Sequence, residues 1–165
     1  MYKIFNTLTL TLFVATSLPA SATAQELAIG LGITDFSTGG EDGAVASVDY
    51  RAKPFTQRRV RSHAFAASAA LTEFGDVFVG AGLSTRWTWD SGWFLESQLT
   101  PGLYTDGTNE NDLGSTFQFR SVLGVGYGFD NGRTLSLAFS HISNASLADD
   151  NPGANFLFLR YHLKF

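Results

Sequence analysis

The chain has 165 residues, enough for one domain, and its composition excludes several classes of protein. It contains no cysteine, so it has neither a disulfide framework nor a thiolate metal site. The formal net charge of -4 provides no basic field for a nucleic acid, which excludes a nucleic-acid partner. Charged residues make up only 16% of the chain, whereas a soluble domain usually carries about a quarter. Its three histidines lack the spacing of metal ligands, so no metal is expected.

The first 24 residues have the pattern of a secretory signal peptide. Lys3 is followed by an uncharged apolar run over 4–18, and Ala22-Thr23-Ala24 forms a small-x-small cleavage site. The apolar run is short for a transmembrane helix, which is the alternative interpretation. We therefore predict a signal peptide over 1–24 and a mature chain over 25–165 that begins at Gln25.

The mature chain alternates between apolar and small or polar residues in segments that are bounded by turn signals. These segments lie at about 26–34, 43–52, 60–72, 76–89, 92–104, 115–129, 133–145 and 154–165. Each segment is long enough to cross a bilayer with tilt, and eight is an even number, as bacterial outer-membrane barrels require. The pattern predicts an all-β fold, an eight-stranded antiparallel transmembrane β-barrel.

A soluble β-sandwich or a lipocalin-like barrel would also alternate, so the membrane needs separate evidence. The larger apolar side chains share one face of each segment, and the opposite face is small and polar, which is the reverse of a soluble barrel. Trp87, Trp89 and Trp93 flank the turn at 90–92, as an interfacial aromatic girdle would. We therefore expect the protein in the bacterial outer membrane.

Eight strands leave an interior that side chains fill, so a porin-like channel is a weak alternative. The predicted inward face is rich in Gly, Ala and Ser, and it also carries Glu96 and Arg120, which we expect to pair because a buried charge needs a partner. The tight turns at 90–92 and 130–132 are expected on the periplasmic side with both termini. The loops at about 35–42, 73–75, 105–114 and 146–153 would then be extracellular.

The segment Ser140-His141-Ile142-Ser143 places two chemically active side chains on the predicted lipid face. His141 and Ser143 are two residues apart on one strand, so their Cβ atoms are about 6–7 Å apart. Asn155 has the same parity on the next segment and can lie beside His141. Polar groups that face hydrocarbon are costly, and function is the default explanation for them. The alternative is that 141–145 lies above the membrane, where such residues are ordinary.

These residues match a family pattern. The match consists of His141, Ser143, Asn144, Ala145, the loop Asn151-Pro152-Gly153 and the terminal Phe165. The pattern resembles the outer-membrane lipid A 3-O-deacylases, the PagL type that is also grouped with acyloxyacyl hydrolases. The resemblance is specific over 140–165. It implies an eight-stranded barrel with a cofactor-free esterase site on its outer wall, where Ser143 is the nucleophile, His141 the general base, and Asn144 and Asn151 part of the oxyanion region.

The chain departs from the family pattern at one position. The resemblance implies a Glu as the third member of the triad, and Asn155 occupies that place. An amide can orient an imidazole, but it adds no negative charge. Asp149 or Asp150 in the adjoining loop is an alternative third member. Lipid A in lipopolysaccharide is the expected substrate, and a catalytically silent structural or adhesive barrel is the rival interpretation. The sequence leaves open the preferred acyl chain and whether the barrel forms a homodimer.

Overall fold

A computed structural model describes residues 25–34, 43–107 and 111–165. The predicted signal peptide over 1–24 and the loop at 35–42 lie outside these residues, so the cleavage site stays a prediction. No helix in the described residues is long and apolar enough to cross a membrane.

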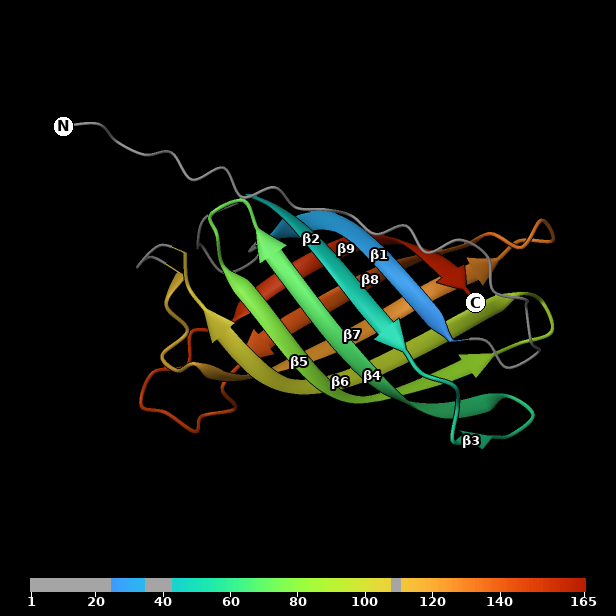
Figure 1. Ribbon diagram of the computed structural model, residues 1–165, viewed down its shortest axis with the longest axis horizontal. Coiled ribbons are helices and arrows are strands. Elements are labelled where there is room, and N and C mark those ends of the chain that lie inside the picture. Colours follow the sequence, from blue (N-terminus) through green and yellow to red (C-terminus); the bar gives the residue numbers. More distant parts are fainter. Residues whose placement is uncertain (1–24, 35–42, 108–110) are drawn as a thin grey trace.

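Nine strands lie in the described parts of the chain. They are β1 (Glu26–Thr34), β2 (Gly43–Arg51), β3 (Thr56–Gln57), β4 (Arg61–Thr72), β5 (Val77–Thr88), β6 (Trp93–Thr105), β7 (Phe117–Gly128), β8 (Thr134–Ser143) and β9 (Ala154–Lys164). Each long strand pairs antiparallel with its neighbours in the chain, and β1 also pairs with β9. The pairing of β2 with β4 completes the closure, which leaves eight strands in the barrel and β3 as an addition on β4 (Figure 1).

Burial alternates along the strands, as the sequence predicted. The outward face carries large apolar side chains such as Leu31, Leu103 and Leu159, which are 62–69% exposed. The inward face carries the buried polar residues, among them Ser47, Asp49 and Gln98. This arrangement suits a barrel that is surrounded by hydrocarbon, because apolar side chains on the exterior are unfavourable in water but not in lipid. The fold is therefore the predicted transmembrane β-barrel and not a soluble barrel.

Several linked ion pairs, rather than the single predicted one, connect the strands inside the barrel. Arg86 pairs with both Glu26 and Glu96. Arg160 lies 3.3 Å from Glu96 and 3.7 Å from Asp49. The predicted pairing of Glu96 with Arg120 is wrong, because Arg120 pairs with Asp49 across the lumen. Both residues do point inward, but which carboxylate each arginine meets depends on the closure of the barrel.

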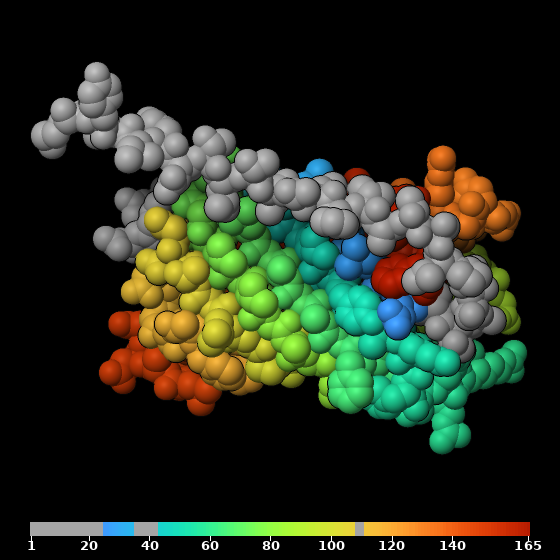
Figure 2. All heavy atoms as spheres, viewed as in Figure 1, coloured from blue at the N-terminus to red at the C-terminus, as the bar shows by residue number. Residues whose placement is uncertain are grey.

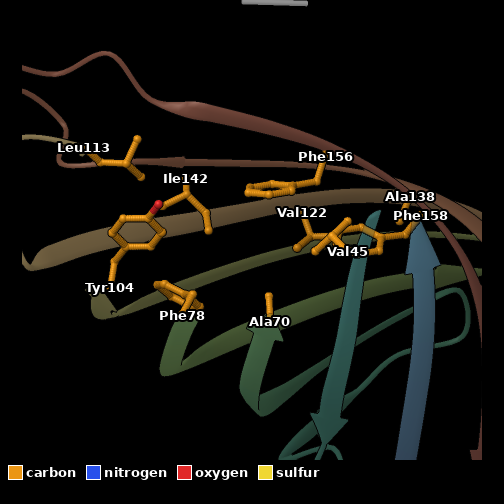
Figure 3. Close-up of a cluster of buried hydrophobic side chains, with 10 residues drawn as sticks. All are labelled: Val45, Ala70, Phe78, Tyr104, Leu113, Val122, Ala138, Ile142, Phe156 and Phe158. Atoms are coloured by element: carbon orange, nitrogen blue, oxygen red, sulfur yellow. The ribbon is translucent and has the colours of Figure 1, made fainter. Parts of the chain in front are cut away.

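Aromatic side chains fill the rest of the lumen, which the sequence pattern did not indicate. Figure 3 shows Phe78, Tyr104, Ile142, Phe156 and Phe158 in one buried cluster. Glycines next to these rings, on the same strand or on the neighbouring strand, leave room for them. A Cβ on Gly32 would lie 3.0 Å from the ring of Phe158, and one on Gly80 would lie 2.7 Å from the ring of Phe78.

The two ends of the barrel differ in the length of their connections (Figure 1). At one end the chain reverses in tight turns, where Gly92 and Gly132 adopt positive φ, and the amide of Phe165 bonds to the carbonyl of Gln25. At the other end lie the longer connections at 106–116 and 144–153. Outer-membrane barrels have short periplasmic turns and periplasmic termini, so the end with the long loops is assigned to the cell exterior.

Candidate active site

His141 and Ser143 lie on the outward face of β8, at its end nearest the extracellular loops. Their neighbours Ser140 and Ile142 are fully buried and face the lumen, whereas His141 and Ser143 are half-buried. The outward direction that we predicted from strand parity is therefore confirmed. Ile142 contributes to the cluster that fills the lumen directly behind this wall (Figure 3), which gives the two outward side chains a packed support.

Asn155 lies directly beside His141. The two residues are partners in the antiparallel register of β8 and β9, and His141 Nδ1 is 2.8 Å from Asn155 Oδ1. An amide oxygen only accepts, so Nδ1 must carry the hydrogen and donate it. In the neutral imidazole with this tautomer, the other ring nitrogen, Nε2, is the acceptor, as a general base needs.

Gly153 fixes the other edge of the imidazole. It has a positive φ of 69°, and a Cβ added there would lie 2.8 Å from His141 Cε1 and 3.4 Å from Nε2. The loop between β8 and β9 therefore passes against the ring, and only glycine leaves enough room. The sequence interpretation used this residue as part of a motif and gave it no role. In the sequence, only its position directly after Asn151-Pro152 could have indicated that Gly153 contacts the imidazole.

Asn144 holds three segments together at the mouth of the barrel. Its backbone N–H donates to Asn151 Oδ1 at 3.0 Å. Its side-chain Nδ2 donates to the carbonyls of Leu113 and Asp150, at 3.1 and 2.6 Å. Every N–H of Asn144 thus has an acceptor within the loops, so its side chain acts here as a clamp. Asn151 is exposed, and its side-chain nitrogen Nδ2 takes no part in these three hydrogen bonds.

The chain leaves β8 through a strained turn. Ala145 and Ser146 both have positive φ, at 55° and 60°, although neither is a glycine. The amide of Leu147 bonds to the carbonyl of Asn144 at 3.1 Å and closes the turn. Non-glycine residues in this region cost free energy and are concentrated at functional sites. The strain starts two residues after Ser143.

The structure brings together part of the predicted constellation. Asn155, rather than Asp149 or Asp150, is the hydrogen-bond partner of the imidazole. Asp149 and Asp150 are exposed in the loop, and no ion pair joins them to His141 within the described residues. His141 and Ser143 share one face, but no hydrogen bond joins their side chains in the described part of the chain. Catalytic hydrogen bonds are often formed only when substrate is bound.

An outward-facing His and Ser on the wall of an eight-stranded barrel define a class, the outer-membrane barrels with a lipid-accessible polar site. The comparisons with known proteins specify the family within that class. The family model for lipid A 3-O-deacylase (PagL) matches residues 46–164. The chain belongs to this family, whose members are outer-membrane enzymes, and the protein is accordingly assigned to the outer membrane.

One curated relative carries the name of the same family, and two solved structures share the barrel fold. The lipid A deacylase PagL of Bordetella bronchiseptica (strain ATCC BAA-588 / NCTC 13252 / RB50) is 27% identical over 81 residues, which span 48% of this chain and 46% of the relative. The match thus spans about half the length of the curated relative. The crystal structure of the outer membrane enzyme PagL superimposes with a TM-score of 0.70 at 19% identity, over 85% of this chain and 99% of that one. Neisserial surface protein A has a TM-score of 0.55 at 13% identity, over 86% of this chain and 96% of that one.

Proposed function

We propose that this protein is an outer-membrane esterase that removes an ester-linked hydroxyacyl chain from lipid A. The observation that carries the proposal is the outward-facing pair of His141 and Asn155, beside Ser143, in a chain of the lipid A 3-O-deacylase family. A polar hydrogen-bonded pair on the lipid face contributes nothing to packing in the lumen and is costly in hydrocarbon. A function is therefore the physical reason to retain it.

The chemistry uses a nucleophile and a general base. His141 Nε2 accepts the proton of Ser143 Oγ while that oxygen attacks the ester carbonyl. When the tetrahedral intermediate collapses, the imidazolium returns the proton to the sugar oxygen, which leaves as an alcohol. Water, deprotonated by the same imidazole, then attacks the acyl-enzyme. The imidazolium returns that proton to Ser143 Oγ as the bond to the acyl group breaks, which releases the hydroxy fatty acid and restores the enzyme. Asn155 orients the ring by accepting the hydrogen of Nδ1, and the reaction needs no cofactor.

The negative charge on the attacked carbonyl oxygen needs donors. In this proposal, the donors are the exposed side-chain amide of Asn151 and backbone N–H groups of the strained turn after Ser143. Asn144 contributes by holding this turn against the loop at 106–116. A site on the outer wall also explains the substrate, because lipid A reaches it by lateral diffusion within its own leaflet. The comparisons give no support for a homodimer, and none is needed by this mechanism.

A catalytically silent barrel is the second candidate, and one observation favours it. The residue that holds the imidazole is a neutral amide, so no negative charge stabilises the imidazolium that forms during the reaction. If the barrel is silent, it would retain the architecture of the family as a structural or adhesive protein. The two candidates differ in whether lipid A changes in mass.

The test compares two serines of one strand. Lipopolysaccharide is incubated with wild type, Ser143→Ala and the control Ser140→Ala, and released hydroxy fatty acid and the mass of lipid A are measured. Ser140 is buried in the lumen, so its hydroxyl cannot touch the substrate. We expect release by wild type and Ser140→Ala, and loss of at least about 10³-fold in Ser143→Ala. No release above background by folded wild type would make the silent barrel the better account.

A further inference from the structure

The connection between β2 and β4, at the end of the barrel opposite the candidate site, is unlike the other turns. Residues 52–61 form a hairpin around the two-residue strand β3, and this hairpin extends beyond the body of the barrel (Figures 1 and 2). Its sequence contains four exposed cations and no carboxylate. The cations are Lys53, Arg58, Arg59 and Arg61.

The hairpin is fixed against the outer wall by specific contacts. The amide of Phe55 bonds to the carbonyl of His63 on β4 at 3.0 Å, whereas the bond from the amide of Arg58 to the carbonyl of Arg61, at 2.7 Å, closes the hairpin itself. The ring of Phe55 lies 5.1 Å from the ring of Phe65 and stacks on His63 at 6.4 Å. Because Phe65 is 63% exposed on the lipid face, these contacts bring the hairpin to the membrane side of the wall.

Aromatic residues mark the depth of the hairpin in the bilayer. Arg61 is the cross-strand partner of Trp87, and the exposed Trp89 and Trp93 flank the adjacent turn. Tryptophans are enriched where the acyl chains meet the headgroups. The cations of the hairpin therefore lie at the level of the lipid headgroups on the periplasmic side.

Within the described residues, no carboxylate forms an ion pair with these cations. The ion pairs formed by arginines in the described residues all involve Arg86, Arg120 and Arg160, whose side chains are in the lumen. An exposed cation at the headgroup level is attracted to anionic lipid, with about a five-fold gain in partition for each Lys or Arg. The exposed apolar Phe55 and Val60 beside the cations fit the same interface.

We propose that the hairpin at 52–61 binds the phosphate groups of anionic phospholipids in the periplasmic leaflet. This binding would hold the barrel at a fixed depth while the site on the opposite end works in the outer leaflet. The proposal does not depend on whether the candidate site is active, since it concerns other residues and the other leaflet.

The experiment measures lipid selectivity. The mature barrel is equilibrated in mixed micelles with equal amounts of phosphatidylglycerol and phosphatidylethanolamine, and retained lipids are counted by native mass spectrometry. The hairpin variant is Arg58→Gln/Arg59→Gln. The matched control is Arg133→Gln/Lys164→Gln, which removes two exposed cations at the same end but outside the hairpin. Heat-modifiable gel mobility confirms that each variant is folded.

We expect wild type and control to retain phosphatidylglycerol in preference, and the hairpin variant to lose about 25-fold of that preference, since each of the two cations contributes about five-fold. Equal preference in wild type and hairpin variant would overturn the proposal. An equal loss in both variants would also overturn it, because net charge rather than the hairpin would then select the lipid. A last arm adds soluble polyphosphate to wild type in zwitterionic nanodiscs. Binding that depends on Arg58 and Arg59 there would assign the hairpin to a soluble polyanion instead.

Discussion

Polar side chains lie on both faces of the barrel wall, and the two sets are satisfied in different ways. In the lumen, Arg86, Arg120 and Arg160 are buried and each lies against at least one carboxylate. On the outer face, His141 is hydrogen-bonded to the uncharged amide of Asn155 beside Ser143. The inner set pairs arginines with carboxylates, whereas the outer pair contains no carboxylate.

The difference shows which polar residues serve the fold. A buried charge that loses its partner is strongly destabilising, so the inner residues depend on one another and on closure of the barrel. The outer residues are half-exposed on one wall, and removing one of them leaves no buried charge behind. We therefore expect inner substitutions to change stability and outer substitutions to change the rate of deacylation.

The two histidines give the largest expected contrast. His141→Gln should lower kcat/KM for deacylation by about 10⁴-fold, because the proposed general base is lost. His162 is buried and bonds to Glu26 and Ser136, both at 2.7 Å. His162→Gln should therefore lower the free energy of unfolding by about 1–3 kcal/mol and leave the rate per folded molecule unchanged. Urea unfolding in vesicles and fatty-acid release measure the two quantities, and a large rate loss in His162→Gln would remove the contrast.

Asp49 tests the inner set directly. It accepts hydrogen bonds from Ser68 and Arg120 and lies 3.7 Å from Arg160. Asp49→Asn should lower the free energy of unfolding by about 3–5 kcal/mol, because the buried guanidinium of Arg120 loses its countercharge and Arg160 keeps only Glu96. Asp90→Asn, in an exposed periplasmic turn, is the control and should change stability by less than about 0.5 kcal/mol. Equal unfolding midpoints for the two variants would contradict a structural role for the inner network.

Strand positions were predictable because the membrane imposes the alternation on every strand. The predicted segments at 26–34 and 43–52 differ from β1 and β2 by at most one residue at an end. The outward direction of His141 followed from the same parity. The strand β3 has only two residues and therefore shows no alternation, so no sequence pattern predicted it.

Contacts between distant strands were not predictable. The partner of Arg120 is Asp49, 71 residues away, and their meeting depends on the diameter and stagger of the closed barrel. Clamping by Asn144 was missed for the same reason, since its acceptor Leu113 lies 31 residues earlier in a loop that folds into the barrel mouth. The neighbouring pair of His141 and Asn155 was predictable because a single loop joins their adjacent strands.

Gly153 tests whether the loop holds the imidazole. Gly153→Ala should lower kcat by about 10–100-fold, because its Cβ would lie 2.8 Å from His141 Cε1 and displace the ring. Gly132→Ala is the matched control, since Gly132 also has a positive φ, of 81°, but a Cβ there would meet nothing within 4 Å. Both variants should lose about 1 kcal/mol of stability from backbone strain. Equal rates for the two variants would mean that Gly153 does not position the ring.

Asn155 gives the smallest expected effect and the sharpest test of how far the two faces differ. Asn155→Glu would place one negative charge beside His141 and so make the outer pair resemble the inner ion pairs. The charge should stabilise the imidazolium that forms in the transition state and raise kcat by about ten-fold, which corresponds to about 1.4 kcal/mol. Asn155→Gln has the same length without the charge, so it should show no gain. Single-turnover release of hydroxy fatty acid from lipopolysaccharide measures both. A gain in Asn155→Glu over a silent wild type would mean that this position removed the activity, whereas equal gains in both variants would assign the effect to side-chain length instead of charge.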